Sequence, residues 1–320
     1  MCITTFLLHL HYKMLPTELL CMIFSHLPAR SIIAVVPQVC SKWKVIVESA
    51  PTELLKFVGP KIQEIALDMC DEGNLSALKV AYIYNFKYDN DMFCIVCENG
   101  HQQVARWLAS HFDLTPDDAR ARNNYALRRG CANGHLDVVK WLVSHFDLTS
   151  DDARAVNNYA LRHSCANGHL QVAKWLASHY DHTLDDARAL ENHALRGSCA
   201  NGHLEVAKWL ASHFILTPDD ARAFNNYALR WSCERGHLEV ARWTVSHFNL
   251  HPDDARASNN YALRNSCRNG HLQVAKWLVS HFHLTRDDAR AENNYALYFS
   301  RDNNYLEVAR WLASHFNITI

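Results

Sequence analysis

One pair of residues that could bind a metal recurs along this chain of 320 residues. Cys131 is followed four residues later by His135, and the same pairing returns at regular intervals. A thiolate and an imidazole at this spacing are zinc ligands, but a zinc site needs about four ligands that converge on one point. The pairs are instead spread along the chain, and Gly134, a helix breaker, separates the two residues. We therefore expect structural roles, no metal and no cofactor.

Paired aspartates are the second set of residues with catalytic potential. Asp151 and Asp152 would act as acid and base only if a pocket gathered them with other titratable groups. They follow Thr149, and an equivalent Thr or His precedes each later pair. A Thr N-cap with acidic residues in the first turn is typical of a helix start. The chain has no Gly-rich phosphate loop and no nucleophile elbow, so we expect no enzymatic activity.

Seven tryptophans reveal how the chain is organised. They stand 34 residues apart, at Trp107, Trp141, Trp175, Trp209, Trp243, Trp277 and Trp311. A fixed period of this length is the signature of a tandem repeat, and repeat arrays present long surfaces to partners. Because the tryptophans are constant, we expect them to form the core of the array, where truncation to alanine costs about 3–5 kcal/mol.

Each repeat contains two helical patterns and one helix start. In one copy the first pattern runs over residues 126–131 and is stopped by Asn133 and Gly134. The second runs from Leu136 to about Phe146, with apolar residues at helical spacing. The third segment, residues 114–120, reads LTPDDAR and predicts a helix start. His145 and its equivalents are expected to pack or cap rather than bind metal.

Composition narrows the choice of partner and compartment. The net charge is -1, with 32 basic and 33 acidic residues, which argues against nucleic acid. Stacked helices lie about 8–10 Å apart, beyond the roughly 7 Å limit for a disulfide, so neighbouring copies of the repeated cysteine cannot pair. We expect reduced thiols and a cytoplasmic or nuclear protein. Residues 2–10 are apolar but too short to span a bilayer, and Met14 is an alternative start. The repeated cysteines are Cys97, Cys131, Cys165, Cys199, Cys233 and Cys267.

The repeat resembles the ankyrin motif PLHxAAxxGHLxVVxxLL. Residues 126–142 read ALRRGCANGHLDVVKWL, and the likeness extends from about Asp91 to the end of the chain. Two features differ: the acidic segment replaces the hairpin between repeats, and Arg128 replaces the motif histidine. This variant is similar to arrays common in amoebae and their large DNA viruses. The resemblance implies an α-solenoid over residues 91–320, in about seven units, without the usual projecting β-fingers. Residues 51–90 would form a connector and a degenerate first repeat.

A second resemblance covers residues 14–50. The segments LPTELL at 15–20, IFSHLP at 23–28 and VCSKW at 39–43 are similar to the F-box. A tryptophan usual after the box is missing. In that family the box is a three-helix segment that docks on the Skp-type adaptor of a cullin-based SCF ubiquitin ligase. By resemblance, the docking residues would be Leu15, Pro16, Leu19, Leu20, Ile23, Phe24, Leu27 and Pro28.

Positions that vary between copies suggest where a target binds. One position in the first helix holds Arg129 in one repeat and Trp231 in another, and we expect it to face solvent. A second variable position, seven residues earlier, holds Leu190 in one repeat and Phe224 in the next. A third, after the second helix, holds Ile215. Exposed apolar residues gathered on a rigid surface are candidate hot spots. Leu190, Ile215, Phe224 and Trp231 are the candidates, with Arg129 as part of a polar rim. The alternative is neutral drift at solvated positions.

The sequence therefore predicts an all-α protein. An N-terminal three-helix F-box-like segment precedes an ankyrin-like α-solenoid with a 34-residue period. The expected function is that of a monomeric substrate adaptor: the F-box holds an SCF-type ligase and the array holds an unknown protein target. The alternative is an ankyrin scaffold or decoy that assembles no ligase. The expected location is the cytoplasm or nucleus, of a host cell if the chain is viral, without membrane or nucleic-acid partners.

Overall fold

The computed structural model describes residues 61–318, which form 17 α-helices and no strand. The all-α class is confirmed. The F-box-like segment and its eight docking residues, together with both possible starts, lie outside the described residues. Within the described range the chain divides into two compact units: residues 61–130 with 137–147, and residues 131–136 with 148–318.

The first unit begins with a helix pair, α7 and α8, in the range where the sequence predicts a degenerate repeat. The helices α7 and α8 are joined by a tight turn at Gly73, whose φ is +69°. α8 starts at Asn74, whose side chain accepts a hydrogen bond from the Ala77 amide. The helices of this unit are α7 Ile62–Asp71, α8 Leu75–Ile83, α9 Asn90–Glu98, α10 Gln102–His111, most of α11 Pro116–Ala132, and α12 Leu136–Phe146. The bounds of α12 are those that the apolar spacing predicts.

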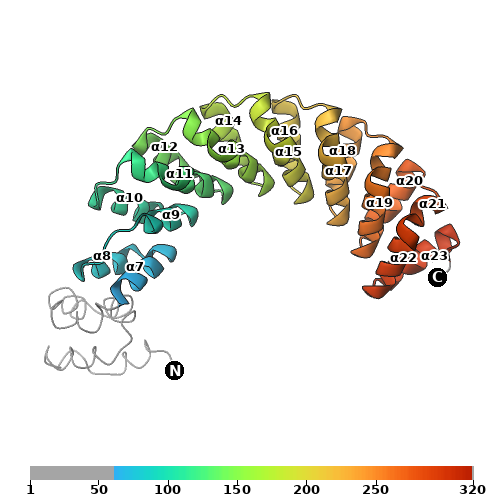
Figure 1. Ribbon diagram of the computed structural model, residues 1–320, viewed down its shortest axis with the longest axis horizontal. Helices are drawn as coiled ribbons and strands as arrows, with labels where there is room; N and C mark the ends of the chain where they lie inside the picture. The colour runs from blue at the N-terminus through green and yellow to red at the C-terminus, as the bar shows by residue number, and fades with distance from the viewer. Residues whose placement is uncertain (1–60, 319–320) are drawn as a thin grey trace, which may run out of the picture. The chain divides into compact units, whose positions relative to one another are not determined.

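The second unit consists of helix pairs that lie side by side (Figure 1). In each pair a long helix packs against a shorter one, and the long helices α13, α15, α17 and α19 contact one another in order. The helices are α13 Ser150–Ala166, α14 Leu170–His179, α15 Leu184–Ala200, α16 Leu204–His213, α17 Pro218–Glu234, α18 Leu238–Phe248, α19 Pro252–Arg268, α20 Leu272–Phe282, α21 Arg286–Ala289, α22 Ala291–Asp302 and α23 Leu306–Phe316.

Each long helix is broken by a left-handed turn. In α13, Val156, Asn157 and Asn158 have φ of 56°, 54° and 59°, and the preceding Ala155 is extended. The same three-residue turn occurs in α11, α15, α17 and α19, and it lies near the start of α22. None of its residues is glycine, although the left-handed region costs L-residues roughly 1–2 kcal/mol each. Asparagine, which tolerates this region best, fills most of the second and third positions.

An arginine stabilises five of the six left-handed turns; at the turn in α22, Tyr298 stands at the equivalent position. Arg196 donates from Nε to the Glu191 carbonyl at 2.5 Å and from Nη2 to the Leu190 carbonyl at 2.9 Å. The equivalent Arg128, Arg162, Arg230 and Arg264 bind their own turns in the same way. This is the arginine that replaces the motif histidine, so the departure from the ankyrin pattern has a local cause.

The acidic segments join consecutive repeats. Thr183 and Asp186 form a capping box at the start of α15, as the Thr N-cap predicts. The Asp186 carboxylate also accepts two hydrogen bonds from Arg154 of the preceding repeat. Nε lies 3.0 Å from Oδ1 and Nη2 lies 3.0 Å from Oδ2. Burial alone would raise the pKa of Asp186, but the hydrogen bonds from Arg154 and the Thr183 amide lower it to about 2. Three further joints repeat the pairing: Arg188 with Asp220, Arg222 with Asp254, and Arg256 with Asp288.

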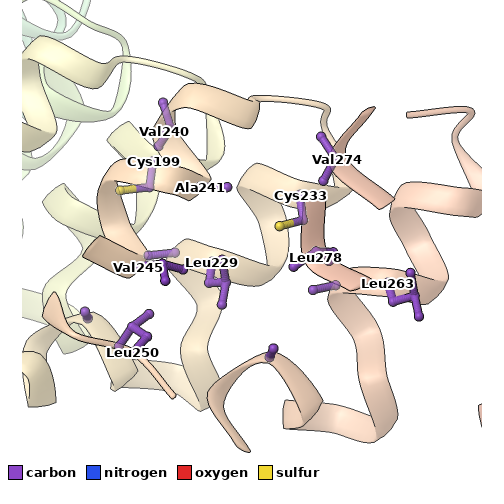
Figure 2. Close-up of a cluster of buried hydrophobic side chains, with 14 of the residues drawn as sticks. Cys199, Leu229, Cys233, Val240, Ala241, Val245, Leu250, Leu263, Val274 and Leu278 are labelled. Carbon is purple, nitrogen blue, oxygen red and sulfur yellow. The ribbon is translucent and has the colours of Figure 1, made fainter. Parts of the chain in front are cut away.

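The repeated cysteines lie in the apolar core. Figure 2 shows Cys199 and Cys233 in the same cluster as Leu229, Val245 and Leu278. Both thiols are fully buried, and the eight cysteines within residues 61–318 are free. Desolvation raises the pKa of the Cys199 thiol to about 12. These cysteines therefore act as small core residues and are not activated nucleophiles.

The repeated tryptophans contribute to the core but are less buried than their constancy predicts. Among the seven, only Trp141 is buried, and the other six are half-exposed at the edge of the helices. Each ring stacks on the histidine four residues later; for Trp209 and His213 the ring centres are 5.2 Å apart, with 20° between the planes. Six of the rings are only partly buried, but Trp209, Trp243, Trp277 and Trp311 still pack against the apolar core of the second unit, so the expected core role holds in part.

Candidate functional site

The Cys–His pairs do not form metal centres in the part of the chain that the structure describes. No group of three or more potential ligands gathers among residues 61–318. The cysteine faces the core, whereas the histidine supports the previous repeat. His203 lies against Gly168, whose φ is +86° and whose added Cβ would stand 2.6 Å from the imidazole Nδ1. Glycine and histidine are thus a matched packing pair between repeats.

The left-handed turns of three consecutive repeats expose apolar side chains. Val156, Leu190 and Phe224 each occupy the first residue of a turn and are 44%, 51% and 56% exposed. We call these three residues the turn row. The next two repeats carry Ser258 and Glu292 at the same position. The turn geometry is the same in all five repeats of the second unit. The apolar side chains at the first turn residue are confined to three consecutive repeats.

Aromatic rings and arginines extend the turn row at Phe224. The Phe224 ring lies 5.9 Å from that of Tyr227, which stacks on Trp231 at 5.1 Å with 21° between the planes. Arg196 lies over Phe224 and Tyr227, at 4.7 and 4.9 Å from the ring centres. Arg235 lies over Trp231 at 5.3 Å. Phe224, Tyr227 and Trp231 form what we call the aromatic stack.

Arg196 connects the turn row to the aromatic stack. It holds the Leu190 carbonyl of its own turn while its guanidinium covers the rings of the following repeat. Burial is the largest influence on this group and lowers the pKa of Arg196. A partly buried guanidinium over two rings is a stronger cation–π contact than an exposed one. These contacts restrict the side-chain rotamers, which suits a binding site because less side-chain entropy is lost on binding.

The structure brings together some of the predicted target-binding residues. Leu190, Phe224 and Trp231 belong to one surface. Ile215 is 78% exposed but lies after α16, at a separate left-handed residue. Arg129 belongs to the first unit, where its guanidinium pairs with Glu98, so it is not shown to form a rim.

The position shared by Arg129 and Trp231 is only partly exposed, whereas the sequence predicts a solvent-facing residue; the Arg129 side chain is 34% exposed. Trp231 is half-buried in the aromatic stack, and the equivalent Asn265 is only 4% exposed. Different side chains are accepted there because each has contacts of its own: Arg129 pairs with Glu98, and Trp231 stacks on Tyr227. Sequence reasoning also left Val156 out of the candidate set and did not foresee the left-handed turns. The paired asparagines after each variable residue are the signal that could have revealed them.

Together these features define a class. This is a helical-repeat interaction protein, in which an open, rigid surface takes the place of a pocket. In residues 61–318 no helix is both long and apolar enough to cross a bilayer.

The comparisons with known families name the class more closely. Models described as ankyrin repeats match residues 129–220, 160–256, 199–288 and 229–320, and another matches residues 92–143. An F-box-like model matches residues 13–51. The chain belongs to the ankyrin-repeat family and carries an F-box-like domain at its N-terminal end. Both are non-catalytic modules that bind proteins.

Comparison with solved and curated proteins adds little. The X-ray structure of an ankyrin repeat family protein from Legionella pneumophila is similar at 17% identity and a TM-score of 0.38. The match covers 94% of this chain and 90% of that one. No curated protein matches the chain.

Proposed function

We propose that this protein is the substrate-recognition adaptor of an SCF-type ubiquitin ligase. The F-box-like domain would bind a Skp-type adaptor through the residues between Leu15 and Pro28, and the ankyrin array would hold the target. Ubiquitin transfer would be carried out by the other subunits. The observation that supports the first half is the F-box-like match at residues 13–51. The protein would act as a monomer in the cytoplasm or nucleus.

The second half of the proposal rests on the turn row and the aromatic stack. Three exposed apolar side chains stand one repeat apart, about 8–10 Å by the usual spacing of packed helices. Rings held by arginines at one end of this row resemble the rigid aromatic anchors that dominate protein interfaces. The polar residues Ser258 and Glu292 follow at the same position. A target with an apolar ridge that spans three repeats would fit this surface.

Adaptor binding is tested by co-precipitation of the full-length protein with Skp-type adaptor and cullin. The intact protein should recover both, and Leu20→Asp with Phe24→Asp should recover neither. The charged replacements introduce unpaired carboxylates into an apolar contact. Recovery of the adaptor by the double variant, or failure of the intact protein to bind it, would refute the ligase proposal.

Target binding is tested by affinity purification and mass spectrometry with turn-row variants. Phe224→Ser gives the turn the residue that the next repeat already has at Ser258, so the fold is expected to tolerate it. Targets should be lost from Phe224→Ser and from Leu190→Ser, while Ser258→Ala should keep them. Targets that survive both row variants would show that the array binds elsewhere.

The alternative is an ankyrin scaffold or decoy that captures the same target without assembling a ligase. In that case the F-box-like domain would be vestigial. Cullin recovery separates the two possibilities: a target that co-purifies without any cullin supports the decoy.

A further inference from the structure

The last helix pair has an open groove that the turn row does not share. α22 and α23 border a cavity of about 390 Å³ whose apolar lining includes Leu297, Leu306 and Ile318. Leu306 is 45% exposed. Ala309 and Ala313 also line it, as do the two cationic residues Arg301 and Arg310.

The same positions one repeat earlier are closed. Leu263, Leu272, Ala275, Val279 and Leu284 are all buried within the core of the second unit, at most 8% exposed. Val279 is replaced by Ala313 in the last repeat, which removes two methyl groups and deepens the groove. The equivalent surface of the preceding repeat is covered by the helices of the next repeat. The groove therefore has a shape that suits a helix.

The presence of Arg301 is evidence against another ankyrin repeat packing on the groove. It stands where the preceding repeat has Cys267, which is fully buried. A further repeat stacked on this face would bury the guanidinium of Arg301 among apolar groups, which is strongly unfavourable without a carboxylate partner. Within residues 61–318 neither Arg301 nor Arg310 forms an ion pair, and no acidic side chain lines the groove. A binding partner with carboxylates could pair with both guanidinium groups.

We propose that this groove binds an amphipathic helix of another protein, with apolar side chains on the groove and Asp or Glu along its flanks. Apolar residues spaced three and four apart would cover Leu306 and the alanines, as helices do when they dock in grooves. The flanking carboxylates would pair with Arg301 and Arg310, which fixes the orientation and rejects basic helices. The site is independent of the F-box-like domain and of the turn row.

The test uses a display library of helical peptides against the full-length protein. Each peptide keeps leucines at helical spacing and carries either Glu or Lys at every flanking position. Selection should enrich Glu, and the best peptide should bind on the order of tenfold more tightly than its Lys counterpart, from two favourable pairs replaced by repulsion. Arg301→Glu with Arg310→Glu should reverse the preference.

Controls distinguish the groove from other sites. Leu306→Asp should abolish binding, whereas Arg242→Glu, at the position equivalent to Arg310 in an interior repeat, should leave it unchanged. Leu20→Asp with Phe24→Asp should also leave it unchanged. The proposal is overturned if no peptide binds, if binding ignores flank charge, or if it survives Leu306→Asp. Light scattering that shows self-association lost in Leu306→Asp would overturn it too, because the occupant would then be a second copy.

Discussion

Asp220 is the residue on which one joint between repeats most depends. Its carboxylate accepts from Arg188 Nε at 2.7 Å and Nη2 at 2.9 Å, and from the Thr217 amide and hydroxyl at 2.8 and 2.9 Å. The residue is only 4% exposed. Asp220→Asn keeps the shape but replaces one accepting oxygen by a donor and removes the charge. We expect a loss of about 2–4 kcal/mol, from about 1 kcal/mol for the cap and about 1.5–3 kcal/mol for the charged hydrogen bonds.

The neighbouring Asp219 provides a matched control. Its side chain is 96% exposed and reaches Arg222 only at 3.8 Å. Asp219→Asn should therefore change stability by less than about 0.5 kcal/mol. Urea unfolding followed by circular dichroism measures both variants. Amide hydrogen exchange should show the opening of Asp220→Asn confined to the repeats on either side, because each repeat contacts only its neighbours. Equal losses in the two variants would refute the reasoning.

The same prediction has a pH arm. Burial acts to raise the pKa of Asp220, but hydrogen bonds from Arg188 and Thr217 outweigh it and lower the pKa from 3.8 to about 2. Because the pKa of Asp220 is lower in the folded than in the unfolded state, its ionised carboxylate stabilises the fold. This stabilisation is present above the unfolded-state pKa of about 4 and is lost as the pH falls towards 2. The difference in Tm between the wild type and Asp220→Asn should therefore shrink over that window. A difference that stays constant from pH 7 to 2 would contradict the assigned role.

Four further substitutions test the packing. Trp141→Ala should cost about 3–5 kcal/mol and the half-exposed Trp243→Ala clearly less, as measured by urea unfolding; equal costs would restore the idea of a uniform tryptophan core. Val156→Asn should raise stability by about 0.5–1 kcal/mol, because asparagine tolerates the left-handed region better than a β-branched residue; a lower unfolding midpoint would count against turn strain. Gly202→Ala should lose about 1–3 kcal/mol, since φ is +83° and the new Cβ would stand 2.7 Å from His237; an unchanged melting temperature would show that the imidazole can move away.

The helices of the repeat were predictable because their causes are local. The apolar spacing between Leu136 and Phe146 and the stop at Gly134 define α12 without knowledge of the neighbours. The capping boxes follow from Thr and Asp three residues apart. Comparison between copies also located the exposed first residue of each turn, Leu190 and Phe224 among them.

The left-handed turns were not predicted because residue-by-residue preference does not include the arginine side chain that holds most of them. Local preference disfavours three consecutive left-handed residues, and the compensation comes from an arginine five and six residues later. The arginine that covers Phe224 and Tyr227 is Arg196 of the preceding repeat, so this part of the site is not contained in a single repeat. Constancy predicted that Trp209 packs on the core, as it does, but not that its ring is only partly buried and stacks on His213.

The uniform joint has an evolutionary consequence. Because every Arg–Asp link in the second unit has the same partners and nearly the same geometry, a copy removed or duplicated between two threonine caps leaves two ends that still fit. The number of repeats can thus change by recombination within the gene without any compensating mutation. A residue of the turn row can be substituted independently, because its side chain takes no part in the Arg–Asp links between repeats. Length and specificity are therefore inherited separately in this array.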